Sequence, residues 1–102
     1  MLDKLTHFDF AALVTERFRL EEGVVTLELE LIGAEVASSS SARDSTRAPF
    51  SLTFRGPREP LLRQRMYPLH HPSLGKLELF LVPIGPDASG QRYQTIVPGG
   101  RA

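Results

Sequence analysis

The chain has 102 residues, of which 41% are hydrophobic, and its 12 Lys and Arg residues balance its 12 Asp and Glu residues. This length predicts a single domain, and the hydrophobic fraction excludes wholesale disorder. Because the chain has no cysteine, a disulfide scaffold and a thiolate zinc site are excluded, and the absence of net charge argues against a general polyanion binder.

A short helix is predicted at the start of the chain. Thr6 is a favourable N-cap residue, and Asp9 stands three residues later, as in a capping box. The apolar stripe at helical spacing consists of Phe10, Leu13 and Val14. We expect a helix over about residues 7–16, and because so short a helix is unstable alone, it should dock on the rest of the domain and plug one end of it.

Two strands follow the helix. Phe18 and Leu20 alternate with arginines, and the EEG sequence at 21–23 is typical of a hairpin turn. Alternation resumes over residues 25–36, but its phase slips by one residue beside Gly33. Such a slip predicts a β-bulge.

Irregular segments separate the later strands. Residues 37–49 (ASSSSARDSTRAP) have no apolar periodicity and are predicted to form a mobile loop. Residues 57–65 contain two prolines, which favour a connection along a sheet edge. The tail from residue 98 is predicted to be frayed.

Four further strands are predicted, over residues 50–55, 66–71, 77–84 and 92–97. The second contains Pro68, which predicts an edge strand because proline donates no backbone hydrogen bond. Strand 77–84 is apolar on both faces, so we expect its outer face to be covered. The N-terminal helix is the first candidate for this cover, and a second sheet layer or another subunit are the alternatives.

Together these elements predict one mainly β domain over residues 1–102. We expect one short N-terminal helix packed on a curled antiparallel sheet of about six strands, forming a partly open barrel or a small sandwich.

The balanced charge is unevenly distributed along the chain. Residues 1–42 hold eight acidic and three basic residues, whereas residues 43–65 hold six arginines against two acidic residues. One interpretation is that the two segments pair across neighbouring strands. The other is a dipolar surface that docks on a partner or on a second copy.

No group of residues matches a catalytic or metal-binding motif. His70 and His71 are adjacent on a predicted strand, so they point to opposite faces and cannot easily share a metal ion, and His7 adds no spacing signature. Serines concentrate in the predicted mobile loop, which cannot preorganise a triad. Glu28 and Glu30 lie on the outer face of a strand, where solvated charge is ordinary. We therefore predict no catalytic residue, no metal site and no cofactor, and expect that the protein is not an enzyme.

Nucleic-acid binding by a small barrel needs basic and aromatic side chains interleaved on an exposed face. The candidate cluster consists of Phe50, Phe54, Arg55, Arg58, Arg63 and Arg65. Because the two phenylalanines alternate with polar neighbours, they are more simply explained as core, and nucleic acid is not an expected partner. A barrel that binds a small ligand or nucleic acid stays as the alternative function, with no small-molecule substrate indicated.

Several segments resemble a known family. They are PFSLTFRGP at 49–57, YPLHHPSLG at 67–75, ELFLVPIGP at 78–86, and the opening LDKLT at 2–6 with Phe8. Together they resemble a family of small uncharacterised bacterial domains, over nearly the whole chain apart from the serine-rich loop. The resemblance implies a loose association with genes for phage-tail-like fibre or collar proteins, and it transfers no catalytic residue.

We therefore expect a non-enzymatic domain that acts by protein–protein contact or self-association, as an accessory or structural subunit of a larger assembly. The expected contact elements are the sheet edges beside residues 57–68 and the charged residues Arg55, Arg58, Arg63, Arg65, Glu28 and Glu30. No apolar run approaches the ~20 residues of a membrane span, and the N-terminus has no signal-peptide pattern. A cytoplasmic protein without a membrane partner is the resulting expectation, with release as part of a particle left open.

Overall fold

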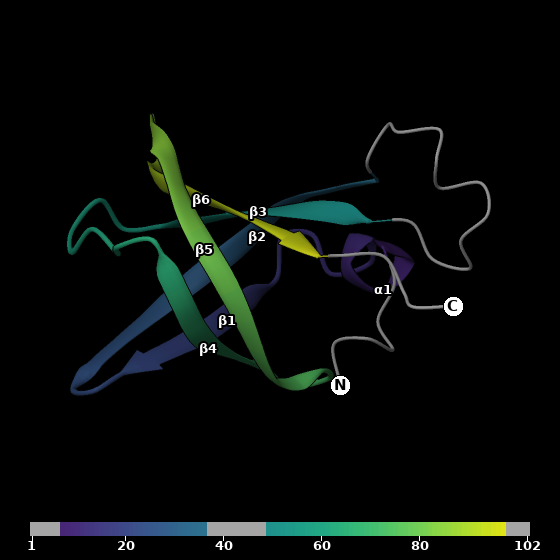
Figure 1. The fold of residues 1–102 in the computed structure, drawn as a ribbon, viewed down its shortest axis with the longest axis horizontal. Helices are drawn as coiled ribbons and strands as arrows, with labels where there is room; N and C mark the ends of the chain where they lie inside the picture. The colour runs from purple at the N-terminus through teal and green to yellow at the C-terminus, as the bar shows by residue number, and fades with distance from the viewer. Residues whose placement is uncertain (1–6, 37–48, 98–102) are drawn as a thin grey trace.

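The computed structural model describes residues 7–36 and 49–97 (Figure 1). The predicted N-cap Thr6, almost all of the predicted mobile loop and the tail from residue 98 lie outside the described residues. The elements are α1 (His7–Ala11), β1 (Arg17–Glu22), β2 (Val25–Val36), β3 (Phe50–Gly56), β4 (Arg65–His71), β5 (Gly75–Asp87) and β6 (Gly90–Val97).

The six strands form a closed antiparallel barrel in the order β1-β2-β3-β6-β5-β4. This confirms the mainly β prediction of six strands and one short helix, and the barrel is closed rather than partly open. The strands follow a period of two except where the register shifts in β2 and β5; in β3, buried and half-buried residues alternate throughout.

The prediction that strand 66–71 lies at a sheet edge is wrong, because β4 pairs with both β5 and β1. The closing pairs are Arg19 with His70 and Leu20 with Leu69. Pro68 directly precedes Leu69 in β4, and it lies just outside the part of β4 that pairs with β1. A strand can therefore have two neighbours and still contain a proline when the missing N–H falls beyond the end of one pairing.

The barrel interior is filled by apolar side chains from every strand. Fully or almost fully buried are Phe18, Leu20, Leu29, Leu31, Phe50, Leu52, Phe54, Tyr67, Leu69, Leu77, Leu79, Leu81, Tyr93 and Val97. The predicted β-bulge is confirmed: the β2–β3 register shifts between Leu31 and Gly33, which brings Ala34 opposite Leu52. Residues 31 and 34 thereby both turn toward the core, across the phase slip seen in the sequence.

The helix is shorter than the predicted span of 7–16. Beyond Ala11 the chain makes tight turns, and Thr15 adopts a positive φ of 84°. The Thr15 N–H donates to the Leu31 carbonyl at 2.7 Å, and the Leu31 N–H donates to the Glu16 carbonyl at 3.0 Å. These bonds to β2 replace the bonds that a longer helix would make.

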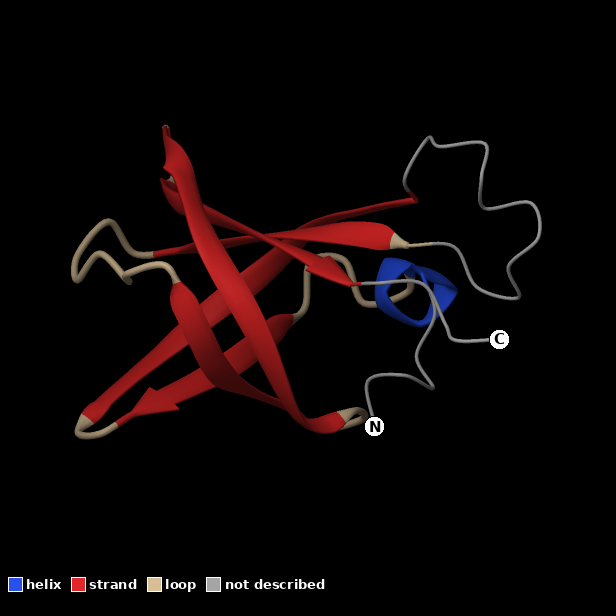
Figure 2. Ribbon diagram, in the orientation of Figure 1, coloured by secondary structure: helices blue, strands red, loops and turns tan. Residues whose placement is uncertain are grey.

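The helix closes one end of the barrel. Phe10 is fully buried and packs on Phe50, with ring centroids 5.7 Å apart. Figure 2 shows α1 beside the end of the barrel where β3 begins and β6 ends. The expectation that the helix covers the outer face of strand 77–84 is wrong: α1 packs against β2 and the barrel end, and Phe80 and Ile84 of β5 remain exposed. Among the described residues, α1 is far too short to cross a membrane.

Candidate functional site

Arg55 is the centre of a charge cluster that joins three strands. Its guanidinium lies 2.9 Å from the Asp87 carboxylate at the end of β5 and 3.5 Å from the Glu30 carboxylate on β2. Glu30 and Arg55 are directly opposite in the β2–β3 register. The acidic and basic segments of the sequence therefore meet inside one sheet at this point, as the first of the two charge interpretations expects.

The turn between β5 and β6 is fixed by Asp87. Its Oδ1 accepts hydrogen bonds from the backbone N–H groups of Ser89 and Gly90, at 2.8 and 2.9 Å. The Arg55 hydrogen bond, together with these N–H groups, lowers the pKa of the Asp87 carboxyl from its usual range. Gly90 lies against the Gly56 carbonyl with no room for a Cβ atom, so the turn packs closely on the end of β3.

The remaining residues of the predicted interaction surface are divided over the barrel. Glu28 pairs with Arg17 at 3.3 Å on the outer face, and Arg58 donates to the Asp87 carbonyl at 2.6 Å. Arg63 is exposed in the connection before β4, and Arg65, at the start of β4, lies over the Tyr67 ring at 5.1 Å. The structure thus brings Glu30, Arg55 and Arg58 together around the β5–β6 turn. Arg63 and Arg65 lie apart from this cluster, just before β4 and at its start.

The phenylalanines of the proposed nucleic-acid cluster are not on the surface. Phe50 and Phe54 are 1% and 0% exposed, so neither can stack on a base.

His70 and His71 point to opposite faces, as predicted: His70 is half-buried on the outside, whereas His71 is buried. The His71 Nδ1 accepts from the Ser73 N–H at 3.0 Å, so its Nε2 carries the proton and donates to the Glu16 carboxylate at 2.7 Å. Its ring packs on Phe18 with centroids 4.7 Å apart. Because both ring nitrogens are engaged, His71 has no free nitrogen with which to act as a base.

No three His, Asp or Glu residues in the described ranges 7–36 and 49–97 are grouped so that they could hold a metal ion. His7 begins α1, and its side chain lies outside the described part of the chain.

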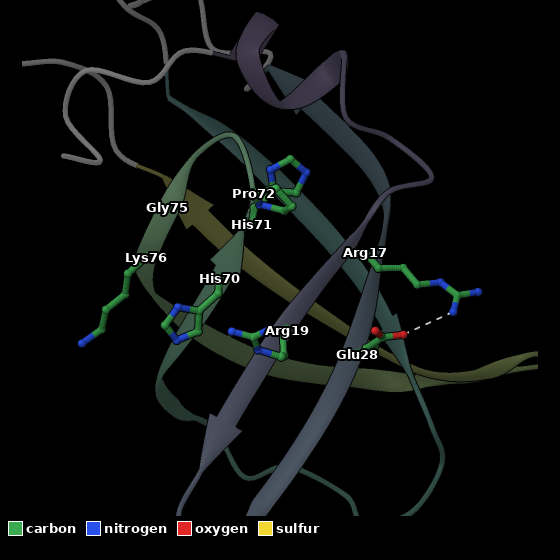
Figure 3. Close-up of a pocket in the computed structure, with 8 residues that line it drawn as sticks. All are labelled: Arg17, Arg19, Glu28, His70, His71, Pro72, Gly75 and Lys76. Atoms are coloured by element: carbon green, nitrogen blue, oxygen red, sulfur yellow. Dashed lines mark hydrogen bonds and ion pairs between the residues drawn. The ribbon is translucent and has the colours of Figure 1, made fainter.

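A hollow of 360 Å³ opens on the outer surface where β1 and β4 close the barrel. We call it the seam hollow; it is lined by Arg17, Arg19, Glu28, His70, His71, Pro72, Gly75 and Lys76 (Figure 3). Arg19, His70 and Lys76 come from the three neighbouring strands β1, β4 and β5, and Arg19 extends toward the His70 ring. The sequence predicts the outward direction of each residue but not this grouping, which depends on the order of the strands.

A second feature is an apolar strip on the outer face of β4, β5 and β6, formed by Met66, Phe80, Val82 and Ile96. Met66 and Phe80 are directly opposite in the β4–β5 register, and Val82 is opposite Gln94, two residues before Ile96 on the same face. Met66, Phe80 and Ile96 are 56%, 44% and 62% exposed. The two-sided pattern of strand 77–84 signals the β5 part of this strip, but nothing in the sequence signals that Met66 and Ile96 join it.

The domain is thus a closed six-stranded antiparallel barrel, capped by a short helix, with a basic hollow at its seam and an apolar strip on its outer face. Its family is shown by a match over residues 5–97 to the domain of unknown function DUF6916. The chain belongs to this family. The comparisons with curated proteins and with solved structures gave no match.

Proposed function

We propose that this domain is a non-enzymatic structural or accessory subunit of a larger assembly and that it acts by protein–protein contact through the apolar strip. The observation that carries the proposal is the exposure of Met66, Phe80 and Ile96 on the outer face of three successive strands, with Met66 and Phe80 directly opposite one another. Single exposed apolar residues are ordinary on protein surfaces, whereas contiguous ones mark contact sites.

The small size of the strip indicates that a single contact between two domains has low affinity. Full burial of one such side chain contributes about 1.5–3 kcal/mol, and three of them are roughly half exposed already in the free domain. The strip then contributes on the order of 2–5 kcal/mol, which suits an assembly in which many contacts act together.

A second copy of the domain fits the strip best. The chain has a formal net charge of zero, so copies approach one another without net repulsion. The resemblance to domains associated with phage-tail-like fibre and collar genes supports a bacterial, phage-tail-like assembly as the setting, because such particles repeat their subunits.

Sedimentation velocity over a dilution series tests the proposal. We expect reversible self-association, and we expect Phe80→Ser to raise the dissociation constant about tenfold, the equivalent of 1.4 kcal/mol. Val24→Ser is the matched control, because Val24 is fully exposed in the β1–β2 turn, away from the strip. A strict monomer at high concentration that also recovers no partner in a pull-down would overturn the proposal.

A further inference from the structure

A row of three basic side chains crosses the outer surface at the seam of the barrel. Arg19 of β1 lies directly opposite His70 of β4, and His70 lies opposite Lys76 of β5. Neighbouring strands are about 4.8 Å apart, and like charges placed directly opposite one another destabilise a sheet. Arg19 and Lys76 therefore place positive charge on both sides of His70, and a bound anion would neutralise it.

The carboxylates beside the row leave much of it open. Glu21 lies 3.0 Å from the Arg19 Nε, and both of these side chains are more than half exposed. Glu78 lies 3.8 Å from the Lys76 ammonium, and both of these side chains are more than half exposed. Exposed pairs of this kind contribute about 0–1 kcal/mol and exchange partners readily.

The seam hollow itself contains little negative charge. Among the described residues, Glu28 is the only acidic residue that lines it, and Glu28 is paired with Arg17 at 3.3 Å. Within the described ranges, the His70 ring makes no hydrogen bond or ion pair. The hollow has a volume of 360 Å³, which is room for a tetrahedral anion.

We infer that the seam hollow binds an oxyanion of the sulfate or phosphate class through Arg19, His70 and Lys76. Arg19 supplies paired N–H donors with the geometry that such oxygens accept, His70 supplies a ring N–H donor, and Lys76 supplies a positive charge from the next strand. This site is independent of the apolar strip: Met66, Phe80, Val82 and Ile96 are not among its lining residues.

Amide chemical shifts in a titration with sodium sulfate test the inference, with sodium chloride at equal ionic strength as the reference. We expect saturable shifts centred on Arg19, His70 and Lys76, and at least about fivefold weaker binding in Arg19→Gln. Arg63→Gln is the control, because it removes the same charge from an exposed residue that does not line the hollow. Shifts identical to those with chloride, or equal losses in the two variants, would overturn the inference.

A substitution of His70 gives a second readout. His70 lies between Arg19 and Lys76 in the strand register, so its ring is placed to contact an anion held by these two side chains. We expect His70→Gln to weaken sulfate binding several-fold while the Arg63→Gln control leaves it unchanged. Unaltered sulfate binding in His70→Gln would contradict the role of His70.

Inorganic phosphate and phosphoserine, compared at one pH, distinguish the source of the oxyanion. Tighter binding of phosphoserine would assign the hollow to a phosphorylated side chain, and equal or weaker binding would assign it to the free anion. Failure of both to compete with sulfate would overturn the inference. An unaltered sedimentation profile in Arg19→Gln would separate this result from any failure of the proposed self-association.

Discussion

His71 is a buried polar side chain whose hydrogen bonds are all made within the fold. Its Nε2–H bonds Glu16, just before β1, and its Nδ1 accepts from Ser73 in the β4–β5 turn. Two segments far apart in the sequence are thereby joined through one imidazole. These hydrogen bonds compensate for the burial of the imidazole, and they also fix the position of the start of β1.

Replacement of His71 by phenylalanine keeps the ring on Phe18 but removes both hydrogen bonds. We expect the free energy of unfolding in urea to fall by about 1–3 kcal/mol, because the Ser73 N–H loses its acceptor. His70→Phe is the matched control, since His70 is outside the core, and it should change stability by no more than about 0.5 kcal/mol. Equal losses in the two variants would contradict the structural role of His71.

Asp87 gives the stability a defined pH dependence. Because the Arg55 hydrogen bond and the backbone N–H groups lower the folded-state pKa of Asp87, its contribution is present above the ordinary carboxyl pKa of 3.8 and is lost as the pH falls through the lower folded value. We expect Asp87→Asn to be less stable near neutral pH and to lose less stability than the wild type on acidification. Urea denaturation at several pH values below about 6 measures this, with Glu78→Gln as the exposed control. If the free energy of unfolding depended on pH in the same way in the wild type and in Asp87→Asn, the role of Asp87 would be contradicted.

At the scale of elements, the helix is held by packing against the barrel rather than by its own length. α1 has five residues, well below the ~12–15 at which isolated helices become stable. Phe10 is fully buried against Phe50, whereas Phe8 is 79% exposed. Among the described side chains of α1, Phe10 is therefore the buried anchor of the cap, and Leu13 and Val14 pack on the core just after the helix.

Phe10→Ala should lower the free energy of unfolding by about 3–5 kcal/mol, the usual range for loss of a buried phenylalanine. Phe8→Ala removes the same atoms from an exposed position two residues earlier, and its effect should be far smaller. Thermal or urea denaturation of both variants makes the comparison. A loss of similar size in both would mean that Phe10 does not anchor the cap.

The strands were more predictable from the sequence than their closure or the helix length. The alternation of Phe50, Leu52 and Phe54 and the slip beside Gly33 are local patterns, and the structure reproduces both. The helix length could not be predicted in the same way, because it is shortened by Thr15 bonding to Leu31, a residue on another element. Local periodicity carries no information about such partners.

At the scale of the whole molecule, both candidate surfaces arise from strand order. The seam hollow needs β1 beside β4, and the apolar strip needs β4, β5 and β6 side by side. In the sequence, Arg19, His70 and Lys76 are an arginine, a histidine and a lysine on separate strands, with no shared motif. The Glu30–Arg55 pair was easier to anticipate, because it follows from the opposite charges of two successive strands.

The closing seam also bears on how the barrel assembles. Only two residue pairs join β1 to β4, against seven between β3 and β6, and Arg19 stands 51 positions before His70. Joining such distant residues costs chain entropy that neighbouring hairpins do not incur. The barrel should therefore open most easily between β1 and β4. An oxyanion bound by Arg19 and His70 would join these two strands and stabilise the closed form through mass action.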